Sequence, residues 1–118
     1  LNEASVKIAR EFNYNCQVGF IENLLFYDET FAVVLSRHVL EHSIHPELTL
    51  QEIHRILHSG GITAHITPHY FPDPEPAHIS QLTIDQWLSL YKKVGFQIIT
   101  SYLAFFNAKE AHIIAMKI

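Results

Sequence analysis

The feature that most constrains the fold is an unbroken apolar run early in the chain, Phe31-Ala32-Val33-Val34-Leu35. The run shows no alternation of apolar and polar residues, which is typical of a strand buried on both faces of a parallel sheet. A helix and another strand after it would therefore indicate an α/β fold.

A helix is predicted directly after this strand. Pro46 suits the first turn of a helix, because its missing N–H has no intrahelical partner there. An apolar stripe at helical spacing follows, and Ser59-Gly60-Gly61 is expected to stop the helix. The stripe consists of Leu48, Leu50, Ile53, Ile56 and Leu57.

A second strand and a loop come next. Ile62 to Thr67 is rich in β-prone residues and ends at Pro68. Residues 70–77 hold prolines at every second position from Pro72, so an irregular loop is expected there. Loops that follow strand ends are frequent positions for functional residues.

The two ends of the chain carry further elements. Near the N-terminus, Glu3 to Phe12 has helical periodicity, and a short strand is expected over Cys16 to Phe20. Near the C-terminus, Thr83 to Val94 predicts a capped helix that ends at Gly95. The helical spacing of Ile84, Trp87, Leu88 and Tyr91 indicates core packing rather than a ligand site.

The chain is expected to end in an antiparallel hairpin. Two β-rich runs, Phe96 to Phe106 and Ala111 to Ile118, are joined by the polar stretch Asn107-Ala108-Lys109-Glu110. With no internal repeat and no linker, residues 1–118 are expected to form a single α/β domain.

Composition excludes several classes of function. The formal charge is −4 and the eight Lys and Arg are scattered, so no nucleic-acid partner is expected. The apolar runs are far shorter than a membrane span, and no membrane partner is expected. Cys16 is the single cysteine, which favours a reducing, cytoplasmic compartment. A chain that starts at Leu1 without Met is expected to be incomplete or processed.

Two ordered motifs resemble the class I S-adenosylmethionine (SAM)-dependent methyltransferases, in particular the small-molecule methyltransferase domain of type 11. The stretch from Asn23 to His42 resembles N-L-P-F-x-D-x-x-F-D-x-V-x-x-x-x-V-L-E-H. The stretch from Gln51 to Gly61 resembles the helix and E-x-x-R-x-L-x-P-G-G turn before the fifth strand of that fold. The last helix and the final hairpin also fit, so the resemblance covers nearly the whole chain.

The resemblance implies a partial Rossmann-like methyltransferase sheet, with equivalents of strands 4-5-7-6, an antiparallel last hairpin and flanking helices. Strands 1 and 2, and the glycine-rich loop that approaches the cofactor, have no counterpart here. None of the four glycines can form that loop. The chain alone is therefore expected to lack a full cofactor site, and SAM is the cofactor of the intact domain. Phe20, Leu25 and Ala32 replace residues that are usually Asp, Pro and Asp.

The resemblance also implies roles for individual residues. Ile21 and Glu22 correspond to the segment that passes the adenine of the cofactor. Ser36, Arg37 and His38 correspond to residues at its methionine end. His69 and His78 follow the second strand, in the loop region that shapes the acceptor pocket and sometimes supplies a general base. These two histidines are the catalytic candidates, and the acceptor is expected to be a small molecule.

Two alternatives remain open at this point. His38-Val39-Leu40-Glu41-His42 also fits the H-x-x-E-H pattern of inverted zinc proteases, in which two histidines on one helical face bind zinc. No third ligand can be identified from spacing, so no metal site is assigned. Phe20 and Ala32 support the other alternative, a methyltransferase-like binding domain without catalytic activity.

The resemblance finally implies an exposed strand. If strands 1 and 2 are absent, the strand near Phe31 to Leu35 lies at an open edge of the sheet, and such an edge invites pairing. The chain is expected either to self-associate through this edge, as in a dimer, or to cover it with the strand near Cys16 to Phe20.

Overall fold

The computed structural model describes residues 2–69, 73–105 and 109–118. Its elements are α1 (Glu3–Glu11), β1 (Phe31–Arg37), the 3-10 turn η1 (Leu40–His42), α2 (Pro46–Ile56), β2 (Leu57–Pro68), α3 (Ile84–Val94), β3 (Phe96–Phe105) and β4 (Lys109–Lys117). The order confirms the α/β prediction, since helices alternate with strands before a final hairpin.

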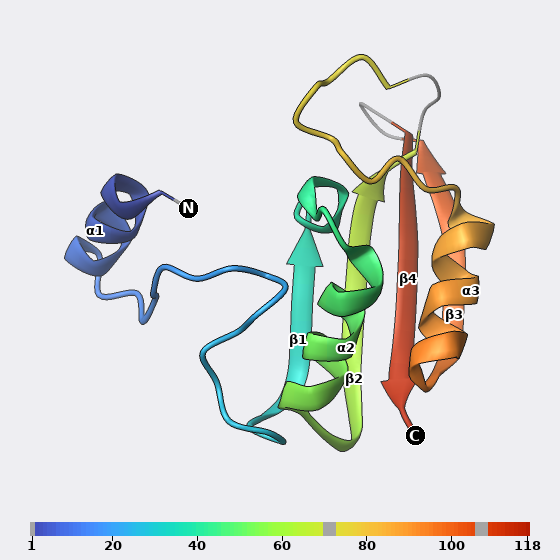
Figure 1. The fold of residues 1–118 in the computed structure, drawn as a ribbon, viewed down its shortest axis with the longest axis horizontal. Helices are drawn as coiled ribbons and strands as arrows, with labels where there is room; N and C mark the ends of the chain where they lie inside the picture. The colour runs from blue at the N-terminus through green and yellow to red at the C-terminus, as the bar shows by residue number, and fades with distance from the viewer. Residues whose placement is uncertain (1, 70–72, 106–108) are drawn as a thin grey trace.

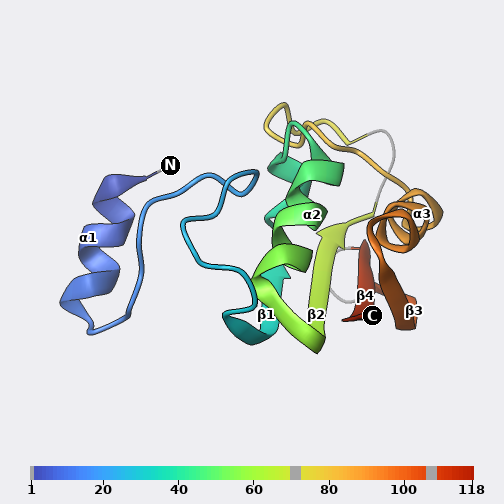
Figure 2. The ribbon, with the colours of Figure 1, turned by 60° about the horizontal axis from the view of Figure 1, so that its bottom comes forward.

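The four strands form a single sheet in the order β1-β2-β4-β3. β1 and β2 are parallel, whereas β4 runs antiparallel to both β2 and β3. This is the predicted partial sheet with equivalents of strands 4-5-7-6. Helices α2 and α3 both pack on one face of the sheet (Figures 1 and 2). The opposite face carries no helix within the described part of the chain.

The core lies between that face and the two helices. Trp87 and Tyr91 of α3 are buried together with Leu50 and Ile53 of α2 and Ile113 of β4. The apolar stripe of α3 is therefore packing, as its spacing predicts. Thr83 caps the helix, because its hydroxyl accepts from the Gln86 amide at 3.2 Å while the Gln86 side chain accepts from the Thr83 amide at 2.8 Å.

The end of α2 differs from the prediction. The helix ends at Ile56, and Ser59-Gly60-Gly61 lies inside β2 instead of stopping the helix. A Cβ on Gly61 would lie 2.8 Å from the His58 carbonyl oxygen and 3.1 Å from that of Ala32. Glycine is required here by the close approach of β1 to the start of β2, not by a helix cap.

The predicted strand over Cys16 to Phe20 is wrong. This segment has one isolated bridge, between Phe20 and Asn23, and no strand partner. Local sequence can favour an extended backbone, but a strand needs a neighbour that satisfies its N–H and C=O groups. The segment instead folds back on α1, where Arg10 donates to the Cys16 carbonyl at 3.0 Å. Helix α1 has no buried residue and lies apart from the sheet (Figure 1).

β1 is an edge strand, as the resemblance implies. It is hydrogen-bonded to β2, and its other edge pairs with no strand in the described ranges. Val33 and Leu35 are 55% and 75% exposed, so the expectation of burial on both faces is wrong. The Cys16 to Phe20 segment does not cover this edge. Self-association through the edge stays a prediction.

The final hairpin is confirmed, with β4 beginning at Lys109, two residues before the predicted Ala111. Residues 106–108, which are the last residue of the first predicted run and the first two of the predicted connection, lie outside the described residues, as do 70–72 of the predicted loop. Residues 73–82 hold neither helix nor strand. None of the described helices is long and apolar enough to cross a bilayer.

Candidate active site

Parallel β1 and β2 end on the same side of the molecule, and polar side chains gather there. Residues 73–82, which belong to the loop between β2 and α3, pass over these strand ends and over η1 (Figure 1). Ser80 fixes the loop, because its amide donates to the Glu41 carbonyl and its hydroxyl to the Ser43 carbonyl. Ligand sites in open α/β sheets lie at this carboxyl end of the strands.

His38 leaves β1 with a left-handed backbone, at φ 52°. Its amide still donates to the Ile66 carbonyl at 2.9 Å, while its Nε2 lies 2.5 Å from Oε2 of Glu110. Arg37 reaches the same carboxylate at 3.7 Å. The hydrogen bond to His38 and the charge of Arg37 outweigh burial and lower the pKa of Glu110. The bonds to Glu110 and to the Ile66 carbonyl hold His38 in a backbone conformation that is unfavourable for residues with a side chain.

Glu41, in η1, is the most unusual group at these strand ends. Its side chain is 5% exposed, and neither carboxylate oxygen has a hydrogen-bond partner in the described residues. The nearest cationic atoms are Nδ1 of His38 at 3.7 Å and Nε2 of His42 at 4.0 Å. An ionised carboxylate buried without hydrogen bonds is unfavourable, so it needs a partner.

His78 stands opposite Glu41 on the loop. Its Nδ1 lies 2.6 Å from Oδ2 of Asp73, and its ring packs edge-on against His42 at a centroid distance of 4.9 Å. His42 in turn bonds through Nδ1 to the Ala77 carbonyl at 2.8 Å. Burial raises the pKa of Asp73, but the hydrogen bonds from His78 and the Glu75 amide outweigh it and leave the pKa lowered. Asp73 is therefore a stable acceptor that orients the His78 ring.

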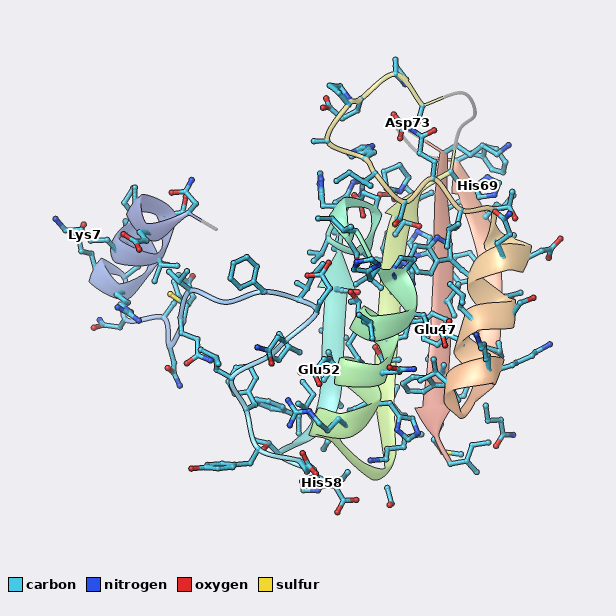
Figure 3. The ribbon with its side chains drawn as sticks, viewed as in Figure 1. Lys7, Glu47, Glu52, His58, His69 and Asp73 are labelled. Carbon is cyan, nitrogen blue, oxygen red and sulfur yellow. The ribbon has the colours of Figure 1, made fainter. Side chains whose placement is uncertain are left out.

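His69 lies on the other side of the strand ends. It directly follows β2, and its amide donates to the Lys109 carbonyl at the start of β4. Asp73 lies at the same end of the molecule (Figure 3). The two predicted catalytic histidines thus approach the strand ends from opposite sides, His69 beside β4 and His78 beside η1.

The predicted adenine segment is fixed to the rest of the molecule by two anchors. Oε1 of Glu22 accepts from the Ser43 hydroxyl at 3.0 Å and the Ile44 amide at 3.1 Å. Burial raises the pKa of Glu22, but these hydrogen bonds and others to the backbone outweigh burial, so the pKa is lowered overall. The Glu22 carboxylate therefore serves to hold the segment against the turn after η1.

Arg55 of α2 is the second anchor. Its guanidinium donates to the carbonyls of Leu24 and Phe26 at 2.9 and 2.8 Å, and to the carboxylates of Asp28 and Glu52. Glu52 also accepts from the Leu24 amide at 2.7 Å, from the side of α2 that faces this segment (Figure 3). The E-x-x-R motif thus acts as a structural clamp.

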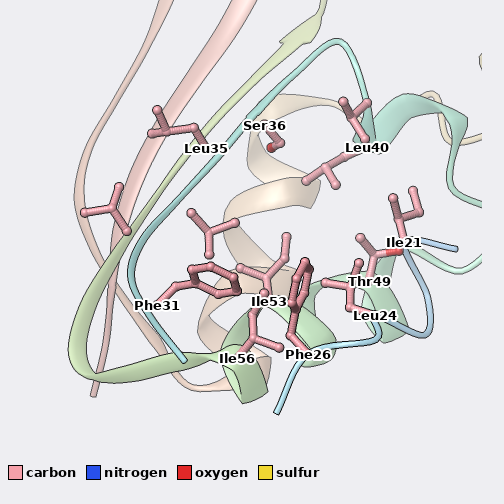
Figure 4. A pocket seen from close by; sticks show the side chains of 13 residues that line it. Ile21, Leu24, Phe26, Phe31, Leu35, Ser36, Leu40, Thr49, Ile53 and Ile56 are labelled. Carbon is pink, nitrogen blue, oxygen red and sulfur yellow. The ribbon is translucent and has the colours of Figure 1, made fainter. Parts of the chain in front are cut away.

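A cavity of about 300 Å³ lies between this segment, β1 and α2 (Figure 4). It is mainly apolar, and Ile21 and Ser36 both line it. The Ser36 hydroxyl is buried without a hydrogen-bond partner in the described ranges. Lining residues from both faces of β1, such as Leu35 and Ser36, place the cavity along the free edge of the strand. Two of the five predicted cofactor residues therefore meet here, whereas Glu22, Arg37 and His38 are not among its lining residues.

The zinc-protease alternative does not fit the structure. That site needs both histidines of H-x-x-E-H on one face of an α-helix. Here His38 has a left-handed backbone and precedes the short 3-10 turn Leu40–His42, so no such face forms. His38 is instead engaged by Glu110.

Sequence reasoning missed Asp73 and Glu110 and considered Glu41 only as part of the H-x-x-E-H pattern. Glu41, Asp73 and Glu110 each contact a histidine at the strand ends. Asp73 and His78 are five positions apart in one loop, a spacing that could have suggested the pair. Glu110 and His38 are 72 positions apart, and no local pattern links them.

Comparison with known proteins shows the family and the fold of the chain. The model of a family described as a methyltransferase domain matches residues 1–65. No curated protein sequence is significantly similar to the chain.

Many solved structures share the fold. A methyltransferase of Bacillus halodurans superposes with a TM-score of 0.81 at 17% identity, covering 99% of this chain and 80% of that one. A SAM-dependent methyltransferase of Thermotoga maritima gives 0.81 at 19% identity, covering 98% and 70%. The [4+2]-cyclase SpnF gives 0.75 at 16% identity, covering 94% and 61%. The chain thus spans less than two thirds of the length of the cyclase and more than two thirds of the length of each of the two methyltransferases.

Proposed function

The chain belongs to the methyltransferase domain family, and on that premise we propose that it takes part in methyl transfer from SAM to a small-molecule acceptor. The strongest support is that Ile21 and Ser36, which the family resemblance assigns to opposite ends of the cofactor, line one cavity. These residues are 15 positions apart and come from different segments of the chain.

The chemistry of the cavity fits part of such a ligand. Ser36 contributes a buried hydroxyl without a partner in the described residues, which is suited to a polar group of the ligand. Ile21, Leu24 and Leu40 contribute apolar surface for an aromatic ring. Arg37 and His38 follow Ser36 at the strand end, and Glu22 follows Ile21, so we assign all five residues to cofactor binding.

The reaction needs little from the protein beyond alignment. SAM supplies an electrophilic methyl group bound to a positively charged sulfur. The chain has to hold the acceptor atom in line with that group and exclude water. Where the acceptor carries a proton, we assign its removal to His69 or His78. The Nδ1–H of His78 donates to Asp73, which leaves Nε2 with the lone pair that accepts a proton.

We further propose that the cofactor site is complete only when a strand pairs with the free edge of β1. The resemblance places the first strand of the family fold, with its glycine-rich loop, at this edge. Val33 and Leu35 are exposed apolar residues on it, and the cavity runs along it. The partner that we propose is a second polypeptide segment that carries such a strand and loop. Self-association of this chain through the same edge would cover β1 but would not supply the loop. The single cysteine supports a reducing compartment such as the cytoplasm.

Calorimetric titration with S-adenosylhomocysteine, with the molar mass measured on the same samples, tests both proposals. We expect the monomeric chain to bind with a Kd no tighter than about 1 mM, and an assembly in which β1 is paired to a strand with a glycine-rich loop to bind at about 1–10 μM. Micromolar binding by the monomer would show that pairing is unnecessary. An assembly with β1 paired to a strand that carries a glycine-rich loop, and still without binding, would overturn the cofactor assignment.

A second function, ligand binding without methyl transfer, is favoured by Phe20, which replaces the usual Asp and is 61% exposed. The likeness to a cyclase also shows that this fold does not dictate the reaction. Transfer of a labelled methyl group in the assembly that binds S-adenosylhomocysteine separates the two functions. Binding without transfer would favour the second function.

A further inference from the structure

We propose that Glu41, His42 and His78 form a binding site for one divalent transition-metal ion of the zinc type. One donor atom of each residue lies within 4.8 Å of the other two. The set of two imidazoles and one carboxylate suits zinc and its neighbours better than magnesium or calcium, which prefer oxygen ligands. This inference does not rest on methyl transfer.

The burial of Glu41 is the observation that points to a ligand. Its carboxylate is enclosed, and neither oxygen has a hydrogen-bond partner in the part of the chain that the structure describes. A protein rarely buries such a group without a compensating charge. The histidine nitrogens nearest to Oε1, in His38 and His42, remain 3.7 and 4.0 Å away. A cation between Glu41 and His42 would satisfy the carboxylate.

Both histidine ligands are held in the tautomer that a metal needs. Nδ1 of His42 donates to the Ala77 carbonyl, and Nδ1 of His78 donates to Asp73. Each ring therefore keeps its lone pair on Nε2. Hydrogen bonds of this kind, from a metal-binding histidine to a carboxylate or a carbonyl, are typical outer partners of zinc ligands.

The site can close on an ion without rearranging the fold. Ligand atoms in zinc sites lie about 2.0–2.2 Å from the metal, so the donor atoms have to move closer together. His42 is 44% exposed and has room to move, while Glu41 and His78 are held by η1 and by Asp73. Three protein ligands leave a fourth position open to water. A metal on Nε2 of His78 would also leave His69 as the general base.

Titration of the untagged 118-residue chain with Zn²⁺, and with Co²⁺ as a spectroscopic probe, tests the site. We expect one equivalent to bind, with the absorption of tetrahedral Co²⁺. Glu41→Gln and His78→Gln should each weaken binding by more than about 100-fold, and Asp73→Asn by about 10–100-fold, the range for outer partners. His58→Gln, at an exposed position on β2, is the matched control and should bind as the unchanged chain does.

The thermal stability of the same variants keeps the test independent of misfolding. Zinc should raise the Tm of the unchanged chain, because it binds the folded state. In metal-free buffer Glu41→Gln should be at least as stable as the unchanged chain, since it removes an unpaired buried charge. Absence of zinc binding, or binding that survives both Glu41→Gln and His78→Gln, would overturn the proposal.

Discussion

The two faces of the sheet differ in a way that the strands themselves do not suggest. On the face under α2 and α3, β2 contributes Thr63, His65 and Thr67, all at most 1% exposed. On the other face the same strand contributes Ile62, Ala64 and Ile66, which are only half-buried. The polar residues are thus enclosed and the apolar ones are uncovered, the reverse of the usual pattern for a strand with one solvated face.

The polar groups of β2 on the covered face are satisfied only in part, because Nε2 of His65 and the hydroxyls of Thr63 and Thr67 have no hydrogen-bond partner in the described residues. Nδ1 of His65 bonds to the Tyr91 hydroxyl at 3.0 Å, and the His65 ring packs edge-on against Trp87 at 4.7 Å. The open face has no comparable cover within the described ranges, and its apolar character continues onto Val33 and Leu35 of β1. The contrast indicates that the apolar core is built on the covered face, whereas the open face leaves apolar surface available for a partner.

The largest expected effect is on the free energy of unfolding, when a side chain of the covered face and one of the open face are each truncated to alanine. Trp87→Ala should lower the free energy of unfolding by about 3–5 kcal/mol, because it removes a fully buried ring from the covered face. Leu35→Ala, on the open face, should change the free energy of unfolding of the monomer by no more than about 0.5 kcal/mol. Urea unfolding measures both. Similar losses for the two variants would show that Leu35 is already packed in solution and would remove the distinction.

Most elements could be predicted from sequence because their signals are local. Thr83 and Gly95 mark the ends of α3, and the run from Phe31 marks β1. The methyltransferase family and the strand order followed from two motifs in the correct sequence order. What local signals could not provide was pairing, which is why Cys16 to Phe20 was expected to be a strand although no neighbour bonds to it.

The site was harder to predict for the same reason. Motif position predicts Ser36 to His38 and His78 as site residues, but most of the side-chain contacts that these residues make are long-range. Glu110 comes from the start of β4, and the backbone of Glu41 is bonded to Ser80 in the loop that follows β2. The covered face of β2 also could not be chosen from alternation, since the alternation of Ile62 to Thr67 favours the wrong face.

The second prediction concerns the histidine enclosed on the covered face. Burial lowers the pKa of His65 to about 3, whereas an unfolded histidine titrates near about 6.5. Between these values only the unfolded chain binds the proton, so stability is complete above about pH 6.5 and decreases as the pH falls. The loss should reach about 2 kcal/mol at about pH 5.

Urea unfolding of the unchanged chain and of His65→Gln from pH 7 to 5 measures this loss. In the variant, the free energy of unfolding should depend much less on pH. Part of the pH dependence should remain, because burial and the charge of Lys117 also lower the pKa of His54. Exposed His58→Gln is the control and should keep the full slope. Equal slopes for the unchanged chain and His65→Gln would contradict a neutral, enclosed His65.

The third prediction compares the two edges of the sheet. If the chain self-associates through β1, Leu35→Lys should raise the dissociation constant at least about tenfold, equivalent to about 1.4 kcal/mol, by placing a charge at the contact. Ile99→Lys makes the same change on β3, the other edge strand, where Ile99 is 52% exposed. It should leave association unchanged. Sedimentation equilibrium measures both. A wild-type monomer at every concentration, or equal effects of the two lysines, would reject the β1 contact.

The smallest expected effect compares two helices that have a similar N-cap, one on the covered face and one apart from the sheet. Thr83 caps α3, and Asn2 caps α1 by accepting from the Ser5 amide at 3.0 Å. Thr83→Ala should lower the free energy of unfolding by about 1 kcal/mol, since fraying of α3 loosens Trp87 above the sheet. Asn2→Ala removes an equivalent bond, but α1 has no buried residue, so global stability should change by less than about 0.3 kcal/mol.

Hydrogen exchange separates local from global effects of the two cap variants. Asn2→Ala should speed exchange in the amides of α1 alone, whereas Thr83→Ala should speed it in α3 and also in the covered strands β2 and β4, whose slowest amides exchange by global unfolding. Faster exchange in β2 after Asn2→Ala would mean that α1 packs on the sheet in solution. In that case the chain itself would already cover part of the open face, and only the edge of β1 would still need a partner.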